Sequence, residues 1–289
     1  MKLLVTGSSG FVGTAFLARY AATHEIVPFS LQRQGWEGLP DLRGVDAVVH
    51  LAALVHQMQG APAEAYRQAN VEYPLELAGR AREAGVRHFL FLSTVKVYGE
   101  VSRTPFTEDS PCAPEDDYGR SKLEAEQRLS QLAGREFTVS LLRTPLIYGE
   151  GVKGNILTLM RWIERSPLLP LGCIRNRRSM IYVGNLAALM EKILRQGKGG
   201  GVYLASDPRP VSTTELVERI SGAFGKKGSP LCIPGMGMVL RHWKPSLHDR
   251  LYADLEVDPS RTVRELGFEA PFTFAEGVEK MVGWYRNRA

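Results

Sequence analysis

The sequence predicts an α/β fold with a doubly wound parallel sheet and a smaller C-terminal lobe. Over the first half of the chain, short apolar runs alternate with longer amphipathic segments. The apolar runs are nearly continuous, as expected for strands that helices cover on both faces. This alternation weakens after about Tyr148, where proline- and glycine-rich stretches become common. We expect the smaller lobe to begin there.

The individual elements follow from their local patterns. Only 15 residues separate Ser30 from Asp46, so we expect at most one turn of helix between the second and third strands. Pro74 predicts a kink in the expected helix over 62–84, and Gly85 directly after this helix would end it. The expected strands are Lys2–Thr6, Glu25–Ser30, Asp46–Leu51, His88–Ser93, Phe137–Arg143 and Gly201–Ala205. The expected helices are Phe11–Ala22, Pro62–Ala84, Tyr118–Leu132, Asn185–Leu194 and Ser212–Phe224.

Composition excludes several classes of protein. The chain has 289 residues, of which 44% are hydrophobic and 23% charged, and this balance excludes a disordered chain. The net charge of +5 suits an anionic small molecule, and no run of like charges indicates a nucleic-acid partner. No apolar stretch approaches the length of a membrane span, so we expect no membrane partner.

The three cysteines indicate a reducing compartment. Cys112, Cys173 and Cys232 are odd in number, far apart and in no paired spacing. We therefore expect no disulfide, no metal site and a cytoplasmic location.

A glycine-rich turn follows the first expected strand and opens the first helix. Gly7, Gly10 and Gly13 recur at a spacing of three in TGSSGFVG. The first would allow a tight turn, the second a close approach to a pyrophosphate, and the third close packing of the helix on the sheet. The N–H groups at the helix N-terminus would face the phosphates. This context predicts a dinucleotide site, and the alternative is a plain strand-to-helix turn.

The end of the second strand predicts which dinucleotide binds. An acidic residue there would favour NAD, but the sequence reads Ser30-Leu31-Gln32-Arg33. Ser30 and Arg33 could accept a 2′-phosphate. The sequence therefore favours NADP, with NAD as the alternative.

A tyrosine and a lysine share one face of the helix that follows the fourth strand. Tyr118 and Lys122 are four residues apart, which is about one helical turn. An ammonium beside the phenol would lower the pKa of the phenol and let it exchange a proton with an alcohol or a carbonyl. Ser93 and Thr94 end the fourth strand, where a hydroxyl could bind the reacting oxygen. The alternatives are an ordinary surface pair and a strand cap.

Together these motifs resemble the extended short-chain dehydrogenase/reductase family, in its nucleotide-sugar epimerase/dehydratase branch. TGSSGFVG is similar to the family's TGxxGxxG, YGRSK to its YxxxK, and LSTVKVYGE to its hydroxyl-bearing segment that ends in VYG. HLAA at 50–53 and LLRTPLIYGEG at 141–151 are similar to segments that line the dinucleotide. The resemblance covers nearly the whole chain and implies a Rossmann fold. Residues 1–150, joined by about 179–206, would bind the dinucleotide, and residues 151–178 and 207–289 would form the substrate-binding lobe.

The resemblance also implies roles for individual residues. Tyr118, Lys122 and Thr94 would be catalytic, with Thr94 rather than Ser93 at the hydroxyl position. The residues expected to bind a nucleotide-linked sugar are Thr94, Lys96, Asn155, Arg178 and Arg250. The residues expected to bind the dinucleotide are Gly7, Gly10, Phe11, Val12, Gly13, Ser30, Arg33, Leu51, Ala52, Ala53, Ser93, Tyr118, Lys122 and Pro145. The resemblance implies a homodimer as well.

Several reactions fit this resemblance. The chain looks most like reductases of nucleotide-linked 4-keto-6-deoxy sugars, which transfer hydride from NADPH to C4 of, for example, a UDP-4-keto-6-deoxy-hexose. The alternative is a UDP-hexose 4-epimerase that keeps NAD tightly bound. A dehydratase is disfavoured because Val95 and Lys96 follow Thr94, where that chemistry usually has Asp and Glu. A non-catalytic cofactor-sensing or RNA-binding module on the same fold is a weaker alternative.

Overall fold

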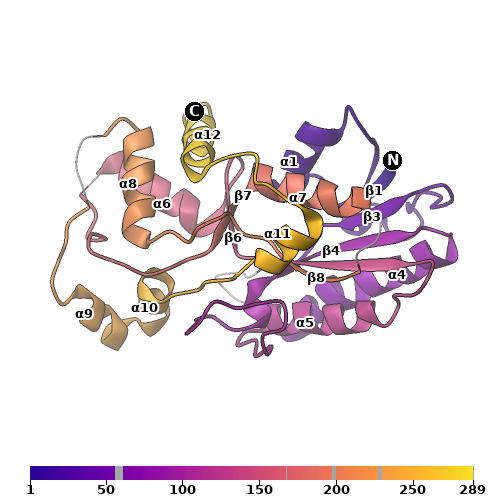
Figure 1. The fold of residues 1–289 in the computed structure, drawn as a ribbon, viewed down its shortest axis with the longest axis horizontal. Coiled ribbons are helices and arrows are strands. Elements are labelled where there is room, and N and C mark those ends of the chain that lie inside the picture. The colour runs from indigo at the N-terminus through magenta and orange to yellow at the C-terminus, as the bar shows by residue number, and fades with distance from the viewer. Residues whose placement is uncertain (56–60, 167, 197–199, 227–229, 289) are drawn as a thin grey trace.

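A six-stranded parallel sheet forms the centre of the molecule (Figure 1). The computed structural model describes residues 1–55, 61–166, 168–196, 200–226 and 230–288. The strand order is β2-β1-β3-β4-β5-β8, and every neighbouring pair is parallel. The order reverses between β1 and β3, and doubly wound sheets bind ligands at the carboxyl ends of the strands beside such a reversal. The strands of this sheet are β1 (Lys2–Thr6), β2 (Glu25–Phe29), β3 (Ala47–His50), β4 (His88–Thr94), β5 (Thr138–Thr144) and β8 (Gly201–Leu204).

Helices cover both faces of the sheet. A second, two-stranded sheet lies beyond the carboxyl ends of the strands of the first (Figure 1). The second sheet pairs β6 (Leu146–Tyr148) with β7 (Met180–Tyr182). The helices of the first half are α1 (Phe11–Tyr20), α2 (Leu31–Gln34), α3 (Ala63–Arg67), η1 (Gln68–Glu72), α4 (Tyr73–Glu83), η2 (Val95–Val97) and α5 (Asp117–Ser130). Those of the second half are α6 (Gly154–Arg165), α7 (Val183–Gln196), α8 (Thr213–Ala223), α9 (Met236–Trp243), α10 (Pro245–Tyr252), α11 (Ser260–Leu266) and α12 (Phe274–Arg286).

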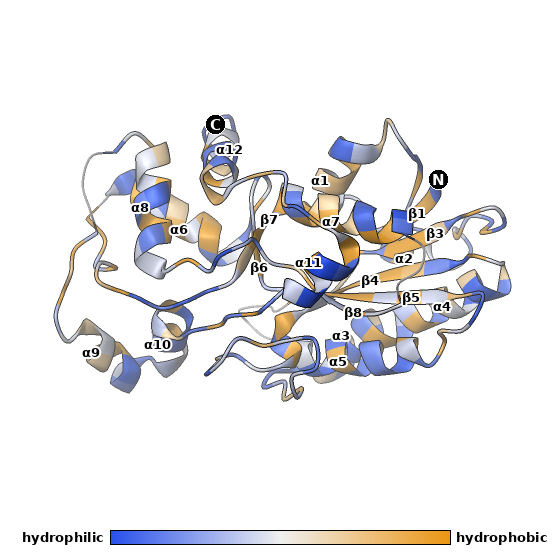
Figure 2. Ribbon diagram, viewed as in Figure 1, coloured by the Kyte–Doolittle hydropathy of each residue, from blue (hydrophilic) through white to orange (hydrophobic). Residues whose placement is uncertain are grey.

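Successive side chains of the buried strands point to opposite faces of the sheet, so the sheet has a separate core on each face. Leu3 and Val5 of β1 pack in the cluster that includes Phe16 of α1 and residues of α7. Leu4, which points to the opposite face, packs in the cluster that includes residues of α4 and α5. All three side chains are fully buried. The strands are therefore apolar on both faces, and in Figure 2 they form an orange layer between helices with blue patches.

The sequence predicted the sheet more accurately than the C-terminal lobe. All six expected strands are present, each within one residue at either end, and the four-residue α2 confirms the short connection after β2. The expected kink near Pro74 takes the form of a π-helical turn, η1, directly before it. A wider turn accommodates a proline ring that cannot donate an N–H to residue 70. The short strands β6 and β7 and the helices α6 and α9 to α12 were not predicted.

Residues from the far end of the chain hold the segment between β4 and α5. The Ser102 N–H donates to the Asp254 carbonyl at 2.9 Å. The Phe106 N–H donates to the Glu256 carbonyl at 2.8 Å, and the Phe106 carbonyl accepts from the Asp258 N–H at 2.8 Å. This pairing fixes the segment that leads into Tyr118.

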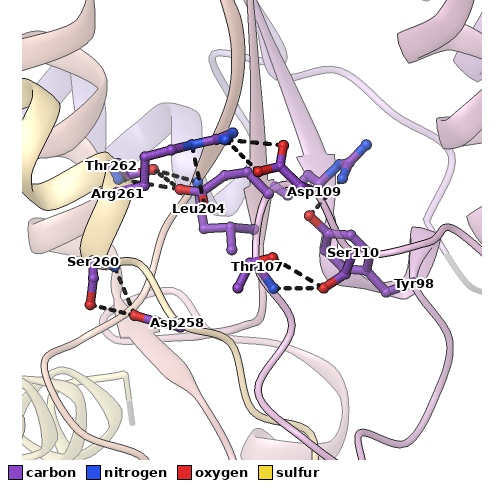
Figure 3. Close-up of polar contacts among 11 residues, drawn as sticks. Tyr98, Thr107, Asp109, Ser110, Leu204, Asp258, Ser260, Arg261 and Thr262 are labelled. Carbon is purple, nitrogen blue, oxygen red and sulfur yellow. Dashed lines mark hydrogen bonds and ion pairs between the residues drawn. The ribbon is translucent and has the colours of Figure 1, made fainter.

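Side chains at the start of α11 extend the same contact (Figure 3). The Thr262 hydroxyl donates to Glu108 at 2.8 Å and accepts from the Leu204 N–H at 2.8 Å. Arg261 pairs with Asp109 at 2.8 Å. Thr262 therefore joins the last strand of the sheet to the segment before α5.

The expectation of three free cysteines was wrong for one pair. Cys173 and Cys232 form a disulfide with a Cα–Cα distance of 5.3 Å, and Cys112 is free. The backbone explains the pairing, because Leu231 donates to the Leu169 carbonyl and accepts from the Gly172 N–H, at 2.7 and 2.9 Å. A sequence separation of 59 residues gives no sign of this proximity. The cysteines therefore no longer support the inference of a reducing compartment.

None of the helices in the described part of the chain combines the length and apolar character needed to cross a membrane.

Thiol titration tests the disulfide. After unfolding without reductant, we expect only Cys112 to react, whereas all three cysteines should react after reduction. Reduction should lower the free energy of unfolding by about 2–4 kcal/mol, because the disulfide restricts the unfolded chain. Cys232→Ser should show the same loss in urea unfolding and no further response to reductant. Three reactive thiols in the unreduced protein would contradict the pairing.

Candidate active site

The turn between β1 and α1 leaves no room for side chains at Gly7 and Gly13. Gly7 has a φ of +67°, and a Cβ there would lie 2.7 Å from the Ala52 nitrogen. A Cβ at Gly13 would lie 2.2 Å from the Gly7 carbonyl oxygen, so α1 packs directly on the turn. Gly10 is the N-cap of α1 and provides no side-chain acceptor for the first N–H groups of the helix. These residues fit the pyrophosphate of a dinucleotide, which such N–H groups can bind.

The loop after β3 is fixed beside this turn. The Ala52 N–H donates to Thr6 Oγ1 at 3.3 Å, and His50 Nδ1 lies 3.0 Å from the same oxygen. The backbone of Leu54 bonds in both directions to the Asn70 side chain, at 2.8 and 3.0 Å. The expected dinucleotide-lining segment, 51–53, therefore lies against the glycine turn.

Tyr118 and Lys122 lie one turn apart at the start of α5. The helix begins there because the Asp116 side chain caps its N-terminus. Tyr118 is half-buried, and its ring centroid is 6.5 Å from that of Tyr66. Lys122 is 1% exposed, and its Nζ lies 3.8 Å from the centre of the Phe91 ring.

Burial has the largest effect on the pKa values of Tyr118 and Lys122. It raises the pKa of Tyr118, and Asp116 and Tyr66 raise that pKa further. Burial lowers the pKa of Lys122 to about 7, against an opposing effect of Glu126. The expected lowering of the phenol pKa by Lys122 is therefore not found in the protein by itself. Near neutral pH the Tyr118 phenol is therefore protonated, and the Lys122 amine, one helical turn away, is close to its own pKa.

A buried ion pair links α5 to the two strands beside it. Arg143 on β5 donates to Glu126 at 2.6 Å, with side chains 6% and 2% exposed. Arg143 also donates to the Tyr98 hydroxyl at 2.6 Å. The Ser93 hydroxyl donates to Glu126, and the Ser93 carbonyl accepts from Thr144 at 2.9 Å. The hydroxyl and the carbonyl of Ser93 are thus each bonded to the protein, which fixes the end of β4 against α5 and β5.

Thr94 faces the opposite side of β4 from Ser93, because successive strand residues alternate. Its Oγ1 accepts from the Lys96 N–H at 3.3 Å, and the residue is 7% exposed. The Lys96 ammonium pairs with Asp116 at 2.5 Å and with Glu100 at 2.7 Å. Lys96 therefore lies at the N-terminus of α5, close to Tyr118, and two carboxylates balance its charge.

The two arginines expected to bind a diphosphate meet at α10. Arg178 donates to the carbonyls of Asp249 and Ala253, at 3.3 and 3.1 Å, where this helix ends. Arg250 lies on the same turn of α10 and is exposed. Burial lowers the pKa of Arg178, with nearby carboxylates opposing. Asn155 is exposed in the first turn of α6, and no hydrogen bond among the described residues joins it to the arginines.

The remaining expected dinucleotide contacts lie at the carboxyl edge of the sheet. Ser30 precedes α2, directly after β2, and Arg33 is exposed on α2. Pro145 is buried between β5 and β6. Phe11 is half-buried in the first turn of α1, 3.2 Å from where a Cβ on Gly151 would lie. Val12, on the same turn, is buried.

Sequence reasoning missed the residues that support the site, namely Asn70, Glu126 and Arg143. The sequence itself gave an indication for Glu126 and Arg143. Glu126 lies four residues after Lys122 on the helix face that carries Tyr118. Arg143 is a charge at the end of an otherwise apolar strand. A buried charge of either kind needs a partner, so the two residues could have been paired.

A family model supplies the decisive comparison. The model of the NAD dependent epimerase/dehydratase family matches residues 3–205. The chain belongs to this family. The resemblance inferred from the motifs is thereby confirmed, and the chain is an enzyme of the short-chain dehydrogenase/reductase type.

The relatives that match almost the whole chain include two 4-epimerases and two dTDP-glucose 4,6-dehydratases. The UDP-glucose 4-epimerase of Vibrio cholerae is 35% identical over 307 residues, covering 96% of this chain and 94% of the relative. The N-acetyl-alpha-D-glucosaminyl-diphospho-ditrans,octacis-undecaprenol 4-epimerase of Escherichia coli O157:H7 is 27% identical over 313 residues, covering 96% and 93%.

Solved structures confirm the fold. The UDP-N-acetylglucosamine 4-epimerase from Bacillus cereus has a TM-score of 0.80 at 22% identity and covers 99% of both chains. RMD from Pseudomonas aeruginosa, complexed with NADPH, has a TM-score of 0.80 at 23% identity, again covering 99% of both. At these identities the likeness shows the Rossmann-like sheet alone.

Replacing Lys122 by methionine should abolish turnover and stabilise the protein at low pH. The pKa of Lys122 is about 7 in the folded protein and 10.5 ordinarily, so between these values the unfolded chain binds the extra proton. The wild type should therefore gain stability relative to Lys122→Met as the pH rises above about 7.

Urea unfolding at about pH 6 and about pH 9 measures this effect. The advantage of Lys122→Met should be largest at the lower pH and shrink at the higher one. Lys280→Met, which removes an exposed lysine of α12, serves as the control and should show no such trend. An advantage that does not change with pH would contradict the shifted pKa.

Proposed function

We propose that this enzyme interconverts the C4 epimers of a nucleotide-linked hexose, with a tightly bound nicotinamide dinucleotide as its hydride store. The observation that carries the proposal is the arrangement of Thr94, Tyr118 and Lys122 at the same sheet edge as the glycine turn. The UDP-glucose 4-epimerase of Vibrio cholerae, at 35% identity, supports epimerisation over the dTDP-glucose 4,6-dehydratases, which match at 28% and 27%.

The chain's own residues would handle the proton and the substrate oxygen. When bound, the dinucleotide would supply hydride transfer at C4. The Thr94 hydroxyl would hydrogen-bond the C4 oxygen. Once the neutral Lys122 amine has accepted the Tyr118 proton, the phenolate would take the proton from the C4 hydroxyl and later return it. The Lys122 amine, with a pKa of about 7, would hold or release a proton beside Tyr118. The 4-keto sugar must rotate in the site after the hydride is removed and before it is returned, so that the hydride is added to the other face of C4.

The substrate would be anchored away from the reacting carbon. Arg178 contacts the Asp249 carbonyl of α10, and Arg250 is the next residue of that helix, so two guanidinium groups would be available to bind a diphosphate. Anchoring by the diphosphate leaves the sugar free to turn. We assign residues 1–150 with 179–206 to the dinucleotide and residues 151–178 with 207–289 to the sugar nucleotide. A homodimer is part of the same proposal, on the family resemblance.

Net reduction of a 4-keto sugar is the second candidate. It is favoured by one observation, the absence of an acidic residue at Ser30–Arg33, where an acid would bind the ribose of NAD. A reductase must exchange its cofactor in every cycle, and NADPH is the usual hydride donor for such a reaction.

Product analysis separates the two reactions. Purified enzyme with UDP-glucose and no added cofactor should form UDP-galactose, detected by NMR, if the dinucleotide stays bound. Consumption of NADPH with a UDP-4-keto-6-deoxy-hexose, without epimerisation, would instead support the reductase. Tyr118→Phe should lower turnover at least about 100-fold, because proton transfer is lost. Dinucleotide affinity should change little in this variant, and full activity would refute the assignment.

Arg33→Glu tests which dinucleotide binds. The carboxylate would repel a 2′-phosphate and accept hydrogen bonds from a free ribose, so the preference should shift toward NAD roughly tenfold or more. Titration with NADPH and NADH measures the two affinities. Arg219→Glu, the same charge change on an exposed residue of α8, is the control and should leave their ratio unchanged. An unchanged ratio in Arg33→Glu would show that this residue does not read the 2′ position.

A further inference from the structure

Helix α9 presents apolar side chains to solvent. It spans eight residues and buries none of them. Trp243 is 81% exposed and Met238 is 77% exposed. Monomeric proteins rarely keep such a group of large apolar side chains uncovered. The exposed apolar residues of α9 and its flanks are Leu231, Ile233, Met238, Val239, Trp243 and Leu247.

The apolar side of α9 faces away from the rest of the lobe. Gly237 packs on α10, since a Cβ there would lie 3.1 Å from the Tyr252 ring, and Leu240, three residues on, is half-buried. Val239 and Trp243 are four residues apart on another side of the helix and are exposed. In Figure 1, α9 lies at the end of the C-terminal lobe that is farthest from the six-stranded sheet. The exposed side chains therefore do not cover the dinucleotide edge.

The charged residues of α9 and of its flanks are basic, and the nearest acidic residue along the chain is Asp249 of α10. Between residues 225 and 248 the sequence has no aspartate or glutamate. Arg241 and Lys244 flank Trp243, and both are exposed. A short helix with tryptophan and aliphatic residues among basic ones is typical of helices that lie in the interface of a membrane. Tryptophan favours the headgroup level, and basic residues are attracted to anionic lipids.

We propose that the α9 face, formed by Met238, Val239 and Trp243 with Arg241 and Lys244, docks the enzyme on the surface of an anionic lipid bilayer. This inference goes beyond the proposed function and does not depend on it. It also refines the expectation of no membrane partner, because that expectation rested on the lack of a spanning segment, which surface docking does not need.

A second copy of the chain fits this face less well. Two copies related by a two-fold axis would bring the same basic residues face to face, which is repulsive. A stable protein interface also takes roughly 20–30 residues from each partner, far more than α9 offers. Binding to an anionic lipid surface needs only a few apolar side chains that insert to a shallow depth and basic residues beside them.

Docking would bring the proposed diphosphate site near the lipid surface. The helices α9 and α10 are separated only by Lys244. Arg250 lies on α10, and Arg178 donates to the carbonyls at the end of α10. The face that would touch the lipid and the residues proposed to bind the diphosphate thus belong to one continuous piece of structure.

Vesicle sedimentation of the full chain tests the proposal. The wild type should pellet with vesicles of phosphatidylcholine and phosphatidylglycerol, more weakly with phosphatidylcholine alone, and less as the salt concentration rises. Met238→Ser/Trp243→Ser and Arg241→Glu/Lys244→Glu should each weaken binding at least about tenfold. Trp162→Ser, at an exposed tryptophan of α6, is the matched control and should bind like the wild type.

Fluorescence and light scattering complete the experiment. Emission should shift to shorter wavelength on vesicle binding in the wild type and in Trp162→Ser but not in the α9 variants. Turnover and melting temperature should match the wild type in all variants, so a failure here leaves the proposed reaction unaffected. The proposal is overturned if the wild type does not bind anionic vesicles, or if the control weakens as much as the α9 variants. It is also overturned if light scattering shows a dimer that Met238→Ser/Trp243→Ser dissociates.

Discussion

Glu126 and Arg143 form an ion pair with almost no exposure to water, and three elements of the active site meet at it. Glu126 belongs to α5, Arg143 to β5, and Ser93, which also donates to Glu126, to the end of β4. Removing one partner of such a pair leaves an uncompensated buried charge, which typically costs about 3–5 kcal/mol. The pair therefore fixes how α5, with its tyrosine and lysine, lies against the strand that ends in Thr94.

The same burial sets the chemistry of the neighbouring groups. Lys122 lies one turn before Glu126 and is nearly inaccessible, so its charged form is disfavoured. Burial also keeps the Tyr118 phenol protonated. Burying Lys122 and Tyr118 lowers the free energy of unfolding of the protein. Such a loss is common where catalysis needs a shifted pKa. A protein optimised for stability alone would have an apolar residue in place of Lys122.

The sheet and the position of Tyr118 and Lys122 on one helix could be predicted from local sequence, and the residues that support them could not. A buried strand, the glycine turn and the four-residue spacing of Tyr118 and Lys122 each leave a pattern within one short stretch of sequence. The Cys173–Cys232 disulfide and the contact of Arg178 with α10 join residues far apart in the chain. The α9 helix escaped prediction for a different reason, because it is only eight residues long and follows a proline- and glycine-rich stretch, so too few positions are available to show a helical period.

Residues 102–109 pair with residues 254–262, which are synthesised much later, and this delay affects how the chain folds during synthesis. The strands from β1 to β5 have all been synthesised by residue 144, and such a nascent segment can begin to collapse early. The loop ahead of Tyr118, however, waits for partners up to 154 residues later, such as Thr262 for Glu108. A growing polypeptide can thus form much of its sheet well before the loop that leads to Tyr118 is held in place, since that loop needs partners from the last 36 residues of the chain.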